Sequence, residues 1–284
     1  MEIKKIAVLG AGQMGSGIAQ VAAYSGYEVS MMDVSEQFLE KGVKRIQKSL
    51  DKFVKSGKLA EEDAEKVIET IHTTTEISGA VEGAQLVIEA VPEDLDLKRE
   101  IFGELDEFCE EGAVLASNTT ELSITNIASA TARPERVIGM HWFNPAPVMK
   151  LVEIVAGVDT SEETIEIVKD AAHKMGKETV LVKDAQGFIT SRVLAAHMME
   201  CMRVLEEGVA SAEDIDKAVR LGLNYPMGPF ELADYVGLDT LLFASEGLTE
   251  AFGDRFRAPQ ALRKRVEAGH LGRKTGKGFY NYEE

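Results

Sequence analysis

Apolar residues in the N-terminal part of the chain fall into short strand-like runs, separated by stretches with helical periodicity. A strand over residues 6–9 precedes a glycine turn, a helix of small residues from about Ser16 to Ser25, and a strand from about Tyr27 to Met32. Further apolar runs occupy residues 86–91, 114–117, 137–140, 151–155 and 179–183, and helical stretches occupy residues 95–110 and 161–175. This alternation predicts an α/β domain with a mostly parallel sheet.

Residues 35–55 carry a regular helical pattern. Apolar side chains recur there at a spacing of four, three, four and three residues, at Leu39, Val43, Ile46, Leu50 and Phe53. This spacing places the five side chains on one face of an amphipathic helix.

The strand signal ends after Asp184. From about residue 188 to residue 268 the sequence is typical of helices interrupted by turn-forming pairs such as Gly228-Pro229. We therefore predict two domains, an α/β domain over residues 1–185 and an all-helical domain over residues 186–284.

Composition narrows the class of partner. The chain has 284 residues, of which 31 are Lys or Arg and 48 are Asp or Glu, so its formal net charge is −17. Phosphate contacts dominate nucleic-acid binding, and this charge therefore argues against a nucleic-acid partner. Cys109 and Cys201 form no CxxC pair, and no apolar run approaches the roughly 20 residues that span a bilayer. We expect a soluble cytoplasmic protein with no membrane segment and no metal site.

A glycine-rich turn follows the first predicted strand. Residues 10–15 match the pattern G-x-G-x-x-G, whose first two glycines permit a tight turn against a pyrophosphate and whose third permits close helix–strand packing. Asp33 ends the next strand, where a carboxylate accepts hydrogen bonds from the ribose hydroxyls of NAD and repels the 2′-phosphate of NADP. We therefore predict a Rossmann-like site for NAD, with these loop residues contacting the cofactor: Gly10, Ala11, Gly12, Gln13, Met14 and Gly15.

Polar residues with catalytic potential stand near the ends of predicted strands. Ser117 and Asn118 follow one strand, His141 follows the next, and Glu153 lies within the strand after that. Ligands of open α/β sheets bind outside the carboxyl ends of the strands, so we expect these residues near the glycine turn. Residues 143–150 are rich in turn formers and long enough to bring Glu153 back to the imidazole. A carboxylate on one ring nitrogen leaves the other to exchange a proton with a substrate, as ketone reduction by NADH requires.

The helix predicted over residues 35–55 is basic, although the chain as a whole is acidic. Asp51 is the only acid between residues 41 and 58, where these basic residues occur: Lys41, Lys44, Arg45, Lys48, Lys52, Lys55 and Lys58. Like charges four residues apart disfavour a helix. Their presence indicates an anionic ligand, such as a substrate carrier that bears phosphate.

Six separated segments, in order, resemble the short-chain L-3-hydroxyacyl-CoA dehydrogenase family, and most of all its bacterial 3-hydroxybutyryl-CoA dehydrogenases. They are GAGQMGSGIAQ, VIEAVPED, ASNTTELSIT, MHWFNPAPVMKLVEIV, YPMGPFELADYVGLD and LGRKTGKGFYNY. The resemblance implies NAD-dependent interconversion of a 3-ketoacyl-CoA and a 3-hydroxyacyl-CoA, such as acetoacetyl-CoA and (S)-3-hydroxybutyryl-CoA. It also implies a substrate cleft between the two domains and a homodimer formed through the helical domain.

The resemblance implies roles for individual residues as well. His141 is then the acid/base and Glu153 its partner, while Ser117 contacts both substrate and cofactor. Further cofactor contacts are implied at Glu93, Lys98, Asn118, Asn144 and Lys274. Substrate contacts, including those to coenzyme A, are implied at Asn144, Ser49, Lys52 and Lys55.

One position of the expected active site departs from the family's pattern. The family usually reads GF-x-x-NR where this chain has GFITSR over residues 187–192, so the hydroxyl of Ser191 replaces an amide that positions the carbonyl. We expect Ser191 to keep this catalytic role in a weaker form.

Two other functions remain open at this point. One is a dehydrogenase of a free hydroxy acid or sugar acid such as gulonate, against which the basic helix argues. The other is a non-catalytic structural or cofactor-sensing relative, against which the presence of both His141 and Glu153 argues.

Overall fold

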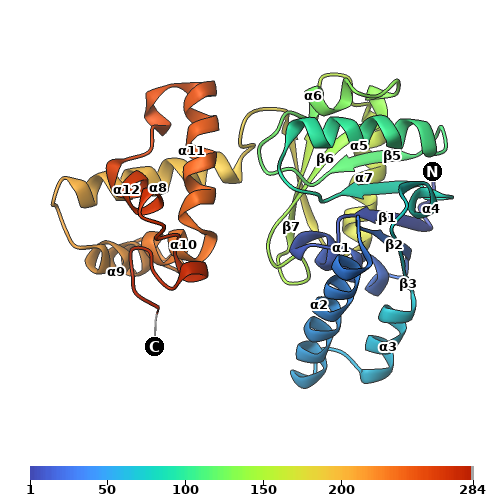
Figure 1. Cartoon of the computed structure of the whole chain (residues 1–284), viewed down its shortest axis with the longest axis horizontal. Coiled ribbons are helices and arrows are strands. Elements are labelled where there is room, and N and C mark those ends of the chain that lie inside the picture. The colour runs from blue at the N-terminus through green and yellow to red at the C-terminus, as the bar shows by residue number, and fades with distance from the viewer. Residues whose placement is uncertain (283–284) are drawn as a thin grey trace. The chain divides into compact units, whose positions relative to one another are not determined.

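An eight-stranded sheet forms the centre of the first of two units into which the chain divides. The computed structural model describes residues 1–282. Unit 1 spans Met1–Asp184 and unit 2 spans Ala185–Glu284. All named strands belong to unit 1 and unit 2 is helical, which confirms the predicted fold class (Figure 1).

The sheet is parallel except at one pair of strands. Its strands are β1 (Lys5–Leu9), β2 (Glu28–Met32), β3 (Ile71–Thr74), β4 (Leu86–Glu89), β5 (Val114–Ser117), β6 (Val137–Trp142), β7 (Leu151–Ala156) and β8 (Glu178–Lys183). They lie in the order β3-β2-β1-β4-β5-β6-β7-β8, and only β6 and β7 are antiparallel. Every residue of β4, β5 and β6 is buried, as expected for central strands covered on both faces.

Helices connect and cover these strands. They are α1 (Gln13–Tyr24), α2 (Glu36–Lys55), α3 (Glu61–Glu69), α4 (Ile77–Val81), α5 (Leu95–Phe108), α6 (Ile124–Ala128), α7 (Glu162–Lys174) and the 3-10 turn η1 (Pro134–Arg136). The predicted apolar stripe of α2 buries Leu39, Ile46 and Leu50, and Ser35 caps the helix by accepting from Phe38 N. In Figure 1, α2 and α3 project from the body of unit 1 as a pair.

Four short elements were not predicted from the sequence pattern, namely β3, α3, α4 and α6. The strand β3 contains one apolar residue, Ile71, and α4 and α6 have five residues each. Periodicity needs a longer window than this. The strand β6 is also longer than predicted, because it continues through His141 to pair with β7.

Unit 2 consists of α8 (Thr190–Glu206), α9 (Ala212–Gly222), α10 (Pro229–Val236), α11 (Leu238–Phe252), α12 (Gln260–Glu267) and the 3-10 turns η2 (Asp254–Phe256) and η3 (Arg273–Thr275). Its core is built around Met198, Met202, Phe230 and Leu262. The buried carboxylate of Asp234 accepts from the backbone N–H groups of residues 279 and 280 and so holds the C-terminal segment to α10. Among residues 1–282, we find no helix with the length and apolar character needed to traverse a bilayer.

Candidate active site

The glycine turn joins β1 to α1 in a conformation that requires glycine at two positions. Gly10 has φ +102°, and a Cβ there would lie 2.6 Å from the Ala90 carbonyl oxygen. A Cβ on Gly15 would lie 1.8 Å from the Gly10 carbonyl oxygen, so α1 packs directly on the turn. The sequence therefore needs glycine here for close backbone packing as well as for the turn.

The same turn fits the pyrophosphate of a dinucleotide. Gly12 is the N-cap of α1, and no side chain caps the first N–H groups of the helix. A Cβ on Gly12 would meet nothing within 4 Å, so the outer side of the turn is open. Free N–H groups and the positive end of the helix dipole attract an anion to this position.

Asp33 lies immediately after β2 and is fixed against the glycine turn. One carboxylate oxygen accepts from Ala11 N at 2.7 Å, and the other accepts from Val34 N at 2.8 Å. Each oxygen keeps a further lone pair, so the carboxylate is positioned to accept from ribose hydroxyls. The geometry fits the predicted role of Asp33 toward NAD.

His141 and Glu153 face each other across the antiparallel strands. They are register partners on β6 and β7, and His141 Nδ1 lies 2.7 Å from Glu153 Oε2. His141 is 5% exposed and Glu153 is fully buried. The carboxylate fixes Nδ1 as the protonated ring nitrogen, so Nε2 is the atom suited to exchange a proton with a substrate. The ring of Phe143 packs against the imidazole with 4.5 Å between centroids.

Two asparagines connect this pair to its surroundings. The side-chain oxygen of Asn118, directly after β5, accepts from Trp142 N at 2.9 Å, next to His141. The side-chain oxygen of Asn144 accepts from Gln13 Nε2 at 2.8 Å. The first contact joins the ends of β5 and β6, and the second brings the turn after β6 to the start of α1. The residues predicted from three strand ends thus meet at one edge of the sheet.

Ser117 belongs to a buried charged network that the sequence did not reveal. Its hydroxyl donates to Glu89 Oε2 at 2.6 Å, while Lys98 Nζ lies 2.6 Å from Glu89 Oε1 and 3.5 Å from Glu93 Oε2. Glu89, Lys98 and Ser117 are fully buried. The ammonium of Lys98 is therefore bound by protein carboxylates, and Glu89 is the residue that orients Ser117. The sequence offered one sign of this network, the acid Glu89 within the apolar run at residues 86–91.

The loop after β5 contains a second acid that was not predicted. Glu121 is 4% exposed, and its Oε2 atom has no hydrogen-bond partner among residues 1–282. Burial, together with the nearby charge of Glu93, raises the pKa of Glu121 to about 7. Glu93 itself accepts from Thr119 Oγ1 at 2.5 Å and from Thr120 N at 2.8 Å, so it organises this loop.

The residues predicted to contact coenzyme A lie toward the C-terminal end of α2. Lys52 and Lys55 are exposed in the last turn of the helix, and Ser49 is half-buried one turn earlier. In the part of the chain that the structure describes, no carboxylate forms an ion pair with either lysine. Both ammonium groups are therefore available to an anion in solvent.

Two predicted site residues lie in unit 2. Ser191 is the second residue of α8 and is half-buried. Lys274 lies in η3, and its Nζ atom is 2.6 Å from Asp239 Oδ2. Across residues 1–282, no group of three His, Cys, Asp or Glu side chains is arranged to hold a metal ion.

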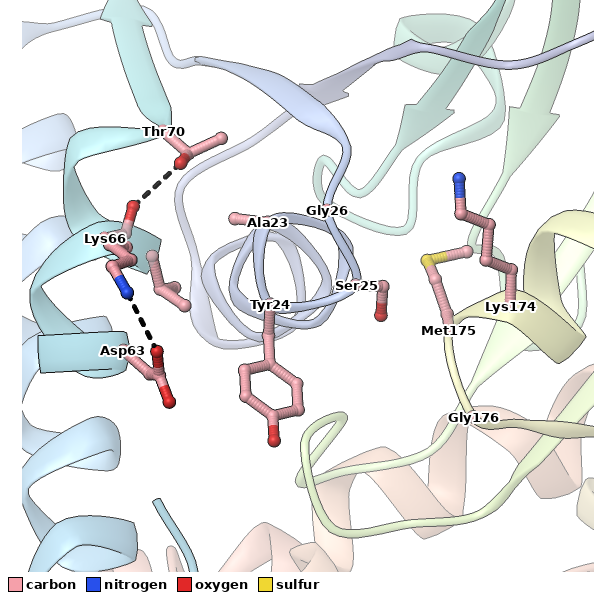
Figure 2. Close-up of a pocket in the computed structure, with 11 residues that line it drawn as sticks. Ala23, Tyr24, Ser25, Gly26, Asp63, Lys66, Thr70, Lys174, Met175 and Gly176 are labelled. Atoms are coloured by element: carbon pink, nitrogen blue, oxygen red, sulfur yellow. Dashed lines mark hydrogen bonds and ion pairs between the residues drawn. The ribbon is translucent and has the colours of Figure 1, made fainter. Parts of the chain in front are cut away.

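A hollow at the far end of α1 is separate from these residues. Figure 2 shows it lined by Tyr24, Lys174 and the pair formed by Lys66 Nζ and Asp63 Oδ1 at 3.2 Å. Tyr24 ends α1, whereas Gly12 caps its start, so the length of a 12-residue helix separates the hollow from the glycine turn. It contributes no residue to the candidate site.

Comparison with known families accounts for nearly the whole chain. The family description "3-hydroxyacyl-CoA dehydrogenase, NAD binding domain" matches residues 5–185. The description "3-hydroxyacyl-CoA dehydrogenase, C-terminal domain" matches residues 187–282.

Individual relatives match the chain over nearly its whole length. The chain is 50% identical to a probable 3-hydroxybutyryl-CoA dehydrogenase of Bacillus subtilis, with 100% of this chain and 99% of the relative covered. It is 45% identical to the mitochondrial hydroxyacyl-coenzyme A dehydrogenase of Homo sapiens, covering 99% of this chain and 92% of that protein. The crystal structure of (S)-3-hydroxybutyryl-CoA dehydrogenase from Ralstonia eutropha superimposes with a TM-score of 0.96 at 42% identity, over 100% of both chains.

Proposed function

Because the chain belongs to the 3-hydroxyacyl-CoA dehydrogenase family, an oxidoreductase family that uses NAD, we propose that it interconverts acetoacetyl-CoA and (S)-3-hydroxybutyryl-CoA. The observation that carries this proposal is the buried contact of 2.7 Å between His141 Nδ1 and Glu153 Oε2. Reduction of the ketone needs a proton donor of this kind beside the cofactor site.

His141 and Glu153 act as the acid/base pair in this proposal. When bound, NADH supplies the hydride and NAD accepts it. In reduction, His141 Nε2 gives its proton to the substrate oxygen as C3 gains the hydride, and in oxidation it takes the proton back. Glu153 holds the imidazole by its Nδ1–H and stabilises the imidazolium, which lets one residue serve both directions.

The other predicted residues bind and orient. The glycine turn and Asp33 hold the dinucleotide, with Asn118, Asn144, Glu93, Lys98 and Lys274 as the remaining proposed cofactor residues. Ser117 and Ser191 position the reacting groups. The Ser117 hydroxyl donates its one hydrogen bond to Glu89, so its oxygen is left to act as a hydrogen-bond acceptor.

The proposed substrate is a coenzyme A thioester because of the charge on α2. Lys52 and Lys55 are exposed cations on a chain of net charge −17, and Ser49 lies one turn before them. Coenzyme A carries several phosphate charges, whereas a free hydroxy acid carries a single carboxylate. These lysines therefore favour the thioester.

The test follows absorbance at 340 nm, as NADH oxidation with acetoacetyl-CoA or free acetoacetate and as NAD reduction with gulonate. We expect turnover with acetoacetyl-CoA at least a hundredfold above that with either free acid. Comparable turnover with a free acid would show that the substrate is not restricted to the thioester and would overturn the proposed substrate class. No turnover with any of the three would favour a non-catalytic relative.

The assembly proposed for the chain is a homodimer formed through unit 2. Exposed apolar side chains on its helices support this, among them Val193, Leu221 and Phe243. Light scattering coupled to size exclusion tests the proposal, since a monomer mass would overturn it. The cytoplasm is the proposed compartment, where both free cysteines would remain reduced.

A further inference from the structure

Helix α2 packs unusually closely on the glycine turn, because Gly42 lies at the contact. A Cβ at Gly42 would lie 2.9 Å from Ala11 Cβ and 2.9 Å from the Ala11 carbonyl oxygen. Glycine therefore lets the helix backbone approach the turn directly. Because residues three or four apart lie on the same face of a helix, the residues one turn after Gly42 also lie beside the glycine turn.

Arg45, three residues after Gly42, uses this approach to reach the turn. Its Nη1 atom donates to the Ala11 carbonyl oxygen at 3.1 Å. Ala11 also donates its N–H to Asp33 Oδ2 at 2.7 Å. One loop residue thus holds a guanidinium on its carbonyl and a carboxylate on its amide.

The guanidinium of Arg45 has capacity left for a ligand. Arg45 is exposed, and among residues 1–282 no carboxylate lies within the 4.0 Å that defines an ion pair with it. Arginine has five N–H donors in a planar fork suited to phosphate, and the contact to Ala11 uses one Nη1 donor. Lys41 stands one helical turn before Arg45 and adds a second positive charge to the same side of α2.

We propose that Arg45 is a cofactor-specificity residue that binds the 2′-phosphate of NADPH, so that this chain uses NADPH as well as NADH. The proposal rests on the dehydrogenase function proposed above. In Rossmann-like sites an acid at the end of the second strand selects the 2′-hydroxyl, and a nearby arginine accommodates a 2′-phosphate. This site has both groups, attached to the two polar atoms of Ala11.

The opposite charges explain how one site serves two cofactors. With NADH, Asp33 accepts from the ribose hydroxyls and Arg45 faces solvent. With NADPH, Arg45 offsets the repulsion between Asp33 and the 2′-phosphate by donating to the phosphate oxygens. Asp33 alone would leave that repulsion uncompensated.

The direct test measures binding by calorimetry and needs no turnover. The probes are 2′,5′-ADP and 5′-AMP, which differ by the 2′-phosphate, and the proteins are the full chain and its Arg45→Gln variant. A hydrogen bond to a charged group has a strength that corresponds to a loss of about tenfold or more when it is removed. We expect Arg45→Gln to weaken 2′,5′-ADP about tenfold and to change 5′-AMP by less than about twofold.

Lys66→Gln is the matched control, since it removes one exposed positive charge from the neighbouring helix α3 without touching the turn. It should change neither affinity. Equal weakening of both probes by Arg45→Gln would place the guanidinium on the 5′-phosphate side and overturn the proposal. An unchanged affinity for 2′,5′-ADP would also overturn it.

A kinetic comparison separates this proposal from the proposed function. With acetoacetyl-CoA, Arg45→Gln should lower kcat/KM about tenfold for NADPH and less than about twofold for NADH. If the chain turned over neither cofactor, the proposed function would fail, yet the binding measurement would still decide the role of Arg45.

Discussion

His141 and Glu153 are direct cross-strand partners, and their side chains lie on the same face of the antiparallel pair with 2.7 Å between Nδ1 and Oε2. The turn over residues 143–150 joins β6 to β7 between them, and Lys177 Nζ holds this turn by donating to the carbonyls of Ala146 and Met149. The backbone therefore determines the imidazole–carboxylate geometry before any ligand binds.

Substitution of the two partners should have graded effects. His141→Ala removes the proposed acid/base group, so kcat with acetoacetyl-CoA should fall about 10²–10⁴-fold. Glu153→Gln preserves the shape of the side chain but removes the charge proposed to stabilise the imidazolium. Its kcat should lie between that of the unmodified chain and that of His141→Ala. Activity within twofold of the unmodified chain in either variant would assign the proton transfer to another group. Far-UV circular dichroism checks that both variants remain folded.

The buried pair of Glu89 and Lys98 should contribute strongly to the stability of the chain. Glu89→Gln leaves the fully buried ammonium with the longer contact to Glu93 as its remaining ion pair among residues 1–282 and with the Val91 carbonyl at 3.4 Å, so we expect a loss of about 3 kcal/mol in the free energy of unfolding. The double variant Glu89→Gln/Lys98→Met removes both charges and keeps similar volumes, so it should regain most of that loss. Urea denaturation measures both values. A double variant no more stable than Glu89→Gln would contradict this account.

Local patterns were enough to predict which residues gather at the candidate site. The glycine turn, Asp33 and His141 lie at or near the carboxyl ends of strands, which alternating strands and helices bring to one edge of a sheet. Glu153 lies within β7, after a turn that leads the chain back to that edge. The return of the chain toward His141 was also predicted, since residues 143–150 are turn formers, but the antiparallel pairing of β7 with β6 was not. What the sequence pattern left open was the register that makes His141 and Glu153 direct partners.

The residues that were missed depend on neighbours distant in sequence. Glu89 is buried because Lys98 and Ser117 are brought to it from α5 and β5, and its own run is apolar strand sequence. Arg45 belonged to a recognised basic helix, but its contact with Ala11 depends on the close packing at Gly42. Periodicity identifies the face of an element and not the partner that the face meets.

Charge reversal on α2 should act on the substrate and not on the cofactor. The double variant Lys52→Glu/Lys55→Glu should raise the KM for acetoacetyl-CoA about tenfold, because it replaces the proposed attraction of the coenzyme A phosphates by repulsion. The KM for NADH should change less than about twofold, and the effect on acetoacetyl-CoA should shrink in high salt. Lys4→Glu/Lys66→Glu carries the same change in charge at exposed sites elsewhere. An equal effect from that control would indicate net charge as the cause.

Glu121 gives the chain a stability that depends on pH. Its pKa rises from 4.5 to about 7 on folding, so the folded chain binds more protons than the unfolded chain between these values. Stability therefore falls as the pH rises through this window, and the full cost of ionising the buried carboxyl is present above about pH 7.

Removing the ionisable group should remove that cost. Glu121→Gln should be increasingly more stable than the unmodified chain as the pH rises from about 5 to about 8, with a gain of at most about 3 kcal/mol at the upper end. Below the unfolded pKa both chains carry a neutral side chain here, so the pH-dependent gain should vanish. Glu111→Gln alters an exposed acid and should show no comparable trend. Urea denaturation across this pH range measures the difference, and a gain independent of pH would mean that Glu121 is ionised at no cost in the folded chain.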